Sequence, residues 1–138
     1  MTALAGESPV PTIAELRKLL RELQKRWRMT DWTIEANIVD RLGPGTTSPW
    51  ALVHYDEYHR FAKISLARNP EPTDQGICPE ASVCLAHEFA HLLLVDLKEC
   101  LEDAIRTSSV DAQQQTRLRW ELGEERFCNV FAEAVTGR

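Results

Sequence analysis

An almost unbroken apolar run from Val83 to Val95 contains the residues that most constrain this chain. Three ionisable residues interrupt the run, His87, Glu88 and His91, and they form the motif His-Glu-x-x-His. On a helix, residues four apart share a face, so both imidazoles can bind one zinc ion, with Glu88 beside its open position as candidate general base. Buried His and Glu are costly unless paired or coordinated, which favours a metal. The alternative is two hydrogen-bonded core histidines and a salt-bridged Glu88.

A catalytic zinc ion needs a third protein ligand, and no further His follows the motif. The best candidate is Glu125, because Asn129 lies one helical turn later and can accept a hydrogen bond from a ligating histidine. Glu125 shares a helical stripe with Leu118 and Leu122, so we expect it to face the core. Glu124 is rotated from it by about 100° and is expected in solvent.

The segment from Glu125 to Ala132 is similar to the E-x-x-A-N-x-F-A segment of the ImmA/IrrE-type metallopeptidases, which are small gluzincins of bacteria and prophages. The resemblance implies a minimal zincin-like domain that binds Zn²⁺. It also implies roles for individual residues: His87, His91 and Glu125 as zinc ligands, Glu88 as catalytic base, and Asn129 as the residue that orients a ligand. Cys128 stands where that family usually has alanine. We expect it to be a small core residue, although a thiolate is also a possible zinc ligand.

The remaining pattern predicts an α+β fold. Thr12 and Glu15 form a capping box that begins a helix running to about Arg28. Residues 32–39, 51–55 and 61–66 are expected to form a three-stranded antiparallel sheet. The motif helix follows, then a short helix ending near residue 107. A last helix over residues 110–134, capped by Ser108 or Ser109, carries the third ligand, and Gly123 interrupts it as a candidate bend.

The 138 residues are expected to form one domain over residues 11–138, preceded by a flexible tail of residues 1–10. A net charge of −5 argues against a nucleic-acid partner. We see neither a signal peptide nor an apolar run long enough to span a membrane, so the chain is expected in the cytoplasm. The four cysteines include no C-x-x-C pair and are expected to be free thiols. The first helix has a basic face, interpreted as solvated.

These features predict a zinc-dependent peptidase that acts on a protein or peptide substrate. A hydrogen-bond donor to the oxyanion is also expected, with His54, Tyr55, Tyr58 and His59 as candidates. The main alternative is a non-catalytic zincin-fold binding module in which zinc is structural. A DNA-associated protease of the SprT-like kind is a third possibility, which the acidic balance and the missing zinc ribbon disfavour.

Overall fold

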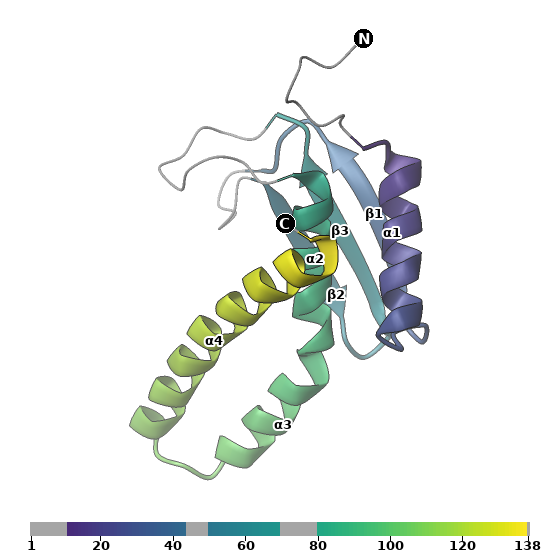
Figure 1. The fold of residues 1–138 in the computed structure, drawn as a ribbon. Coiled ribbons are helices and arrows are strands. Elements are labelled where there is room, and N and C mark those ends of the chain that lie inside the picture. The colour runs from purple at the N-terminus through teal and green to yellow at the C-terminus, as the bar shows by residue number, and fades with distance from the viewer. Residues whose placement is uncertain (1–10, 44–49, 70–79, 138) are drawn as a thin grey trace.

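The structure is a computed structural model that describes residues 11–43, 50–69 and 80–137. In these ranges the chain forms α1 (Ile13–Arg26), β1 (Thr33–Val39), β2 (Ala51–Asp56), β3 (Phe61–Ala67), α2 (Ala81–Leu93), α3 (Val95–Ile105) and α4 (Val110–Thr136). Helices α1 and α2 pack on the sheet and on each other, and α4 packs on α2 (Figure 1). The predicted α+β class is therefore confirmed. The predicted tail of residues 1–10 lies outside the described residues.

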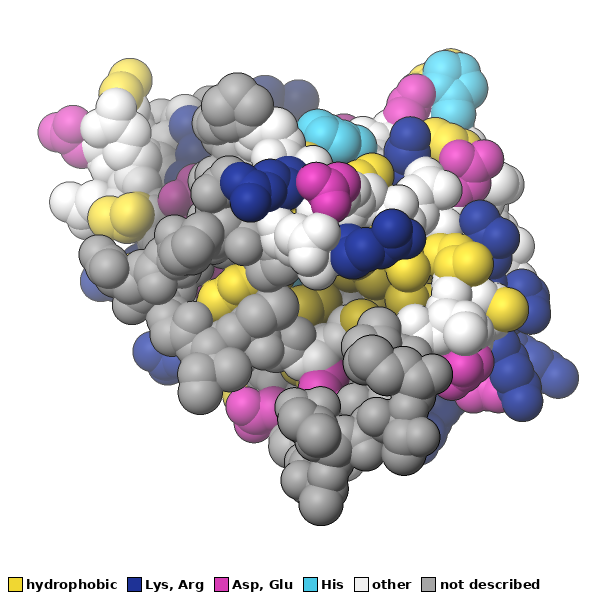
Figure 2. Space-filling model, turned by 90° about the horizontal axis from the view of Figure 1, so that it is seen from above, with side chains coloured by type: hydrophobic (Ala, Val, Ile, Leu, Met, Phe, Trp, Pro, Cys, Tyr) yellow, Lys and Arg dark blue, Asp and Glu magenta, His cyan; other side chains and the backbone are white. Residues whose placement is uncertain are grey.

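Helix α1 begins as its sequence predicts. The Thr12 side chain accepts a hydrogen bond from the Glu15 backbone, and the Glu15 side chain accepts one from the Thr12 backbone. The apolar stripe buries Leu16, Leu20 and Leu23. The opposite, basic face is exposed, and its lysines and arginines gather along the edge of the molecule where α1 lies (Figure 2).

The sheet is mixed, so the antiparallel prediction is wrong in part. Strands β2 and β3 form the expected antiparallel hairpin, but β1 pairs with the other side of β3 and runs parallel to it. The sequence predicts each strand but not its neighbour, because residues 40–50 are long enough to carry the chain across to either edge of the hairpin. Ala62, Ile64 and Leu66 of β3 are buried beneath the helices, as the alternating pattern predicts. The central strand is β3, which leaves β2 at one edge of the sheet.

Helix α4 is continuous through Gly123, and Ser109 caps it by accepting a hydrogen bond from the Ala112 backbone. Its second half enters the core, where Cys128, Phe131 and Ala132 are buried. Its first half extends beyond the sheet together with α3 (Figure 1). In the described ranges, no helix is long and apolar enough to cross a membrane.

The expected core stripe on the first half of α4 is wrong. Leu118 is 59% exposed and Leu122 is 66% exposed. The helical period is present, but within the described residues the sheet and α1 do not reach this part of α4, so they do not bury these side chains. The stripe that carries Glu125 therefore opens to solvent rather than into the core.

Candidate metal centre

The motif lies on α2, and seven residues of this helix are buried, which is why so apolar a sequence is tolerated here. Among the buried residues Glu88 is the charged one, with 7% of its surface exposed. The side chains of His87 and His91 are 20% and 16% exposed, and their rings lie side by side with centroids 5.1 Å apart. Both imidazoles therefore occupy one face of α2, as the spacing predicts.

Helix α4 brings the expected carboxylate to these rings. Glu125 Oε2 lies 3.4 Å from His87 Nε2, and Glu125 Oε1 lies 3.2 Å from His91 Nε2. Its side chain is 60% exposed, so the residue faces an open groove. The three residues proposed as ligands are thus together, although the expectation that Glu125 faces the core is wrong.

The spacing of these atoms suits a shared metal ion. Ligand atoms at 2.0–2.1 Å from a tetrahedral centre are separated by about 3.3 Å. The two nitrogen–oxygen distances, 3.4 and 3.2 Å, are each of that size, and each involves a different oxygen of the Glu125 carboxylate. The same distances also suit ion pairs of protonated imidazoles, so it is the donor set of two imidazoles and a carboxylate that makes this a metal-ligating group. Two imidazoles and a carboxylate are a donor set that zinc accepts.

Glu124 is part of the centre, which corrects the prediction that it lies in solvent. Its side chain is 16% exposed, and its Oε2 lies 2.5 Å from His91 Nδ1. Its Oε1 accepts a hydrogen bond of 2.7 Å from Trp120 Nε1. Glu124 does point to a different side of α4 from Glu125, as the helical rotation of about 100° predicts, but that side faces α2 and not solvent. Trp120 lies one helical turn before Glu124, so the sequence did contain a partner for this carboxylate on the same face of the helix.

Asn129 takes the predicted position near the other imidazole. It lines the same groove as His87, and interaction with its side chain acts to raise the pKa of His87 against the larger, lowering effect of burial. Each histidine of the motif therefore has a polar partner on α4 in addition to Glu125: Glu124 for His91 and Asn129 for His87. Such partners fix the orientation of a ligating ring.

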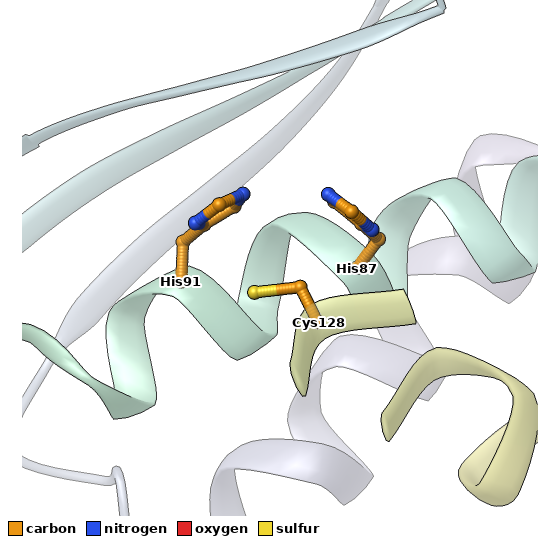
Figure 3. A group of neighbouring side chains, drawn as sticks. All are labelled: His87, His91 and Cys128. Carbon is orange, nitrogen blue, oxygen red and sulfur yellow. The ribbon is translucent and has the colours of Figure 1, made fainter. Parts of the chain in front are cut away.

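Cys128 is a further possible ligand. Its side chain is fully buried. One ligand atom each of His87, His91 and Cys128 lie within 4.8 Å of one another, so this group could hold a metal ion. Figure 3 shows both imidazoles on α2 and the Cys128 sulfur, from α4, directed toward the His91 side of the pair. The two histidines therefore have two candidates for a third ligand close by: the Glu125 carboxylate and the Cys128 thiol.

Burial and neighbouring charges set the protonation of the centre in the absence of metal. Burial raises the pKa of Glu88 to about 7, against the opposing effect of His91. Burial lowers the pKa of His87. Burial acts in the same direction on His91, but hydrogen bonds to Cys128 and Glu124 outweigh it and raise the pKa to about 10. The hydrogen bond from His91 holds the pKa of Glu124 below its usual range.

The centre opens into a groove of about 1050 Å³ between β2, α2 and α4. One wall is formed by β2 and the residue before it, including Trp50, Leu52 and Val53. The other wall is formed by the two helices and includes His87, His91, Glu88 and Glu125. This volume is slightly above the range of about 300–1,000 Å³ that is typical of ligand-binding sites.

The four candidates for oxyanion stabilisation differ in their distance from the groove. Tyr55 lines the groove. His54 is exposed and is not among the lining residues. Tyr58 is 88% exposed in the hairpin turn, and His59 pairs there with Asp56 at 2.6 Å. Tyr55 is therefore the one of the four that the fold brings near the centre.

The chain matches no protein-family model, and comparison with curated proteins and with solved structures gives no match.

Proposed function

We propose that the protein is a zinc-dependent peptidase that hydrolyses a peptide bond in a protein or peptide substrate. The observation that carries the proposal is the convergence of the Glu125 carboxylate on the Nε2 atoms of His87 and His91, beside the buried Glu88 in one groove. These three residues would hold the ion. The proposal agrees with the resemblance of the segment from Glu125 to Ala132 to the ImmA/IrrE-type metallopeptidases, and we propose membership of that family with it.

Each residue has a role that follows from its position. When bound, zinc supplies a Lewis acid and a water of lowered pKa. The Glu88 carboxylate accepts a proton from water and returns it to the leaving amine, a role that suits a carboxyl whose pKa burial has raised to about 7. Glu124 and Asn129 hold the imidazoles of His91 and His87 in place. The groove provides apolar walls for the chain of the substrate.

The test is the substitution Glu88→Gln, which keeps the shape of the side chain and removes the base. Zinc content and melting temperature should stay near those of the parent, while cleavage of a peptide library falls by at least about 100-fold. Glu121→Gln, on the exposed surface of α4, is the matched control and should cleave at the parental rate. A Glu88→Gln variant with parental activity would exclude Glu88 as the base.

The second candidate function is a non-catalytic binding module with structural zinc, and the position of Cys128 favours it. With His87, His91, Glu125 and Cys128 all bound, the ion would have four protein ligands and no open position, as in structural sites. Cys128→Ala distinguishes the two. A peptidase site retains its zinc and its activity in this variant, whereas a closed structural site loses metal affinity together with Cys128.

A further inference from the structure

We propose that the groove continues along the first half of α4, where Leu118 and Leu122 bind two apolar side chains of an extended substrate. The two side chains come from alternate residues of the substrate, on one side of the cleaved bond. This inference names the substrate class of the peptidase proposed above, and it rests on that function for the position of the cleaved bond.

The two leucines belong to the helical stripe that forms part of the α4 wall of the groove. Successive residues of an α-helix are rotated by about 100°, so positions 118, 122, 125 and 129 fall within about 60° of one another. Glu125 and Asn129 line the groove. Leu118 and Leu122 precede them on the same side of a helix that is continuous over Val110–Thr136. The surface at the metal centre and the surface of the two leucines are therefore one continuous face of α4.

This face is apolar for about one helical turn beyond the centre. Leu118 is 59% exposed and Leu122 is 66% exposed, on the half of α4 that extends beyond the sheet (Figure 1). Farther along, the same side of the helix carries Gln114 and Gln115. A partner helix in a groove uses anchors spread over two turns or more, whereas two leucines bounded by amides offer contact to two side chains. The apolar section therefore fits part of a peptide rather than a partner helix.

The spacing of the leucines suits an extended chain. Leu118 and Leu122 are four residues apart, which is about 6 Å along the axis of α4. Alternate residues of an extended peptide point to the same side and are about 6.6 Å apart. From Glu125, the axial distance is about 4.5 Å to Leu122 and about 10.5 Å to Leu118. At about 3.3 Å per residue, a substrate that leaves the centre along α4 reaches the leucines with residues about one and three positions beyond the one at Glu125.

An ion pair holds α3 beside this part of α4. The Arg117 guanidinium donates hydrogen bonds to both carboxylate oxygens of Glu102, from Nε at 3.0 Å and from Nη2 at 2.8 Å. Glu102 is on α3, so the pair joins the two helices one residue before Leu118. The leucine surface is therefore formed before a substrate binds, which reduces the loss of conformational entropy on binding.

The experiment anchors a peptide at the metal, so that the position of each side chain along α4 is known. Labelled peptides of alanine and serine that carry a zinc-chelating hydroxamate are titrated into the zinc-loaded Glu88→Gln variant, and fluorescence anisotropy measures binding. One series has the hydroxamate at the C-terminus and the other at the N-terminus, so both directions of the chain are tested. Within each series a leucine replaces one of the first four residues in turn. In one series, leucine at two alternate positions should tighten binding by at least about fivefold over serine, because apolar surface is buried.

The variant Leu118→Ser/Leu122→Ser, made in the same background, should bind the leucine and serine peptides within about twofold of one another. The matched control is Leu97→Ser/Val130→Ser. It changes two apolar residues that are 56% and 60% exposed and lie outside the described lining of the groove, so it should keep the parental preference. Circular dichroism checks that both variants keep their helical content.

The outcomes separate this inference from the proposed function. Equal binding of leucine and serine peptides, or a preference that Leu118→Ser/Leu122→Ser retains, overturns the inference and leaves the peptidase proposal intact. A parent that is dimeric in light scattering and monomeric in this variant also overturns it, because the leucines then join two copies of the chain.

Failure of every hydroxamate to bind overturns the inference together with the peptidase proposal. A preference for leucine that the double variant loses and the control keeps supports the inference. This result stands even if the parent protein cleaves no peptide, which would remove the peptidase proposal alone.

Discussion

At the scale of single residues, the centre depends on how α4 holds the two imidazoles. Glu124 contacts Nδ1 of His91 and leaves Nε2 of the same ring facing Glu125. The carboxylate thereby fixes which nitrogen is available to a metal. Trp120 in turn holds Glu124 through the opposite carboxylate oxygen. A chain of three side chains on α4 and α2 therefore determines the position of Nε2 of His91, a proposed ligand atom.

Glu124→Gln should accordingly weaken zinc binding by about 10–100-fold, because His91 loses the anionic partner that orients it. Competition with a chromophoric chelator measures the affinity. Glu125→Ala should have a larger effect, because it removes a proposed ligand, and Glu121→Gln should have almost none. If Glu124→Gln binds zinc as tightly as the Glu121→Gln control, the contact with His91 has no part in metal binding.

Asp56 gives a prediction of pH dependence away from the metal. A hydrogen bond with His59, together with bonds from the backbone of the hairpin turn, lowers the pKa of Asp56 below 3.8. A lowered carboxyl pKa stabilises the folded state above about pH 3.8, and this contribution is lost as the pH falls through the folded-state value. His59→Ala should therefore raise the pKa of Asp56 in an NMR titration of the carboxyl group. An unchanged Asp56 pKa in this variant would show that the pair is not formed in solution.

At the scale of elements, the centre requires α2 and α4 to lie antiparallel in a fixed register. The sequence predicts both helices, and for α4 a cap at Ser108 or Ser109, because capping residues and apolar periods are local signals. It also predicts that His87, His91 and Glu125 meet. It does not show that Glu124 faces His91, because a helical stripe does not tell which side is buried until the position of the partner helix is known. The predicted burial of Leu118 and Leu122 is wrong for the same reason: their period is helical, but no helix or strand of the described ranges covers them.

The cap of α4 can be tested directly. Ser109 accepts a hydrogen bond from the Ala112 backbone at 3.2 Å, and replacing such a cap by alanine typically costs about 1 kcal/mol. Ser109→Ala should therefore lower the free energy of unfolding by about that amount in urea denaturation. The neighbouring Ser108→Ala is the control and should change it less. Equal effects of the two substitutions would argue against Ser109 as the cap.

At the scale of the whole molecule, the fold places a polar centre at the edge of an apolar core. Helix α2 buries Leu85, Ala86, Phe89 and Ala90 in the core that it forms with the sheet, α1 and the second half of α4, and its histidines face the groove. The order of the strands leaves β2 beside that groove, and this order was beyond the reach of sequence patterns. In the sequence, β1 could pair with either strand of the predicted hairpin. The two arrangements differ in how α1 and α2 pack on one face of the assembled sheet, which local patterns do not report.

The central claim is that His87, His91 and Glu125 together bind one zinc ion. Native mass spectrometry of protein purified without chelators, then loaded with zinc, measures this most directly. We predict one zinc ion per chain in the parent and in Cys128→Ala, and a loss of zinc in His87→Ala, His91→Ala and Glu125→Ala, with helical content by circular dichroism retained. A parent chain that binds no zinc, or a Glu125→Ala variant that keeps its zinc while Cys128→Ala loses it, would contradict the account.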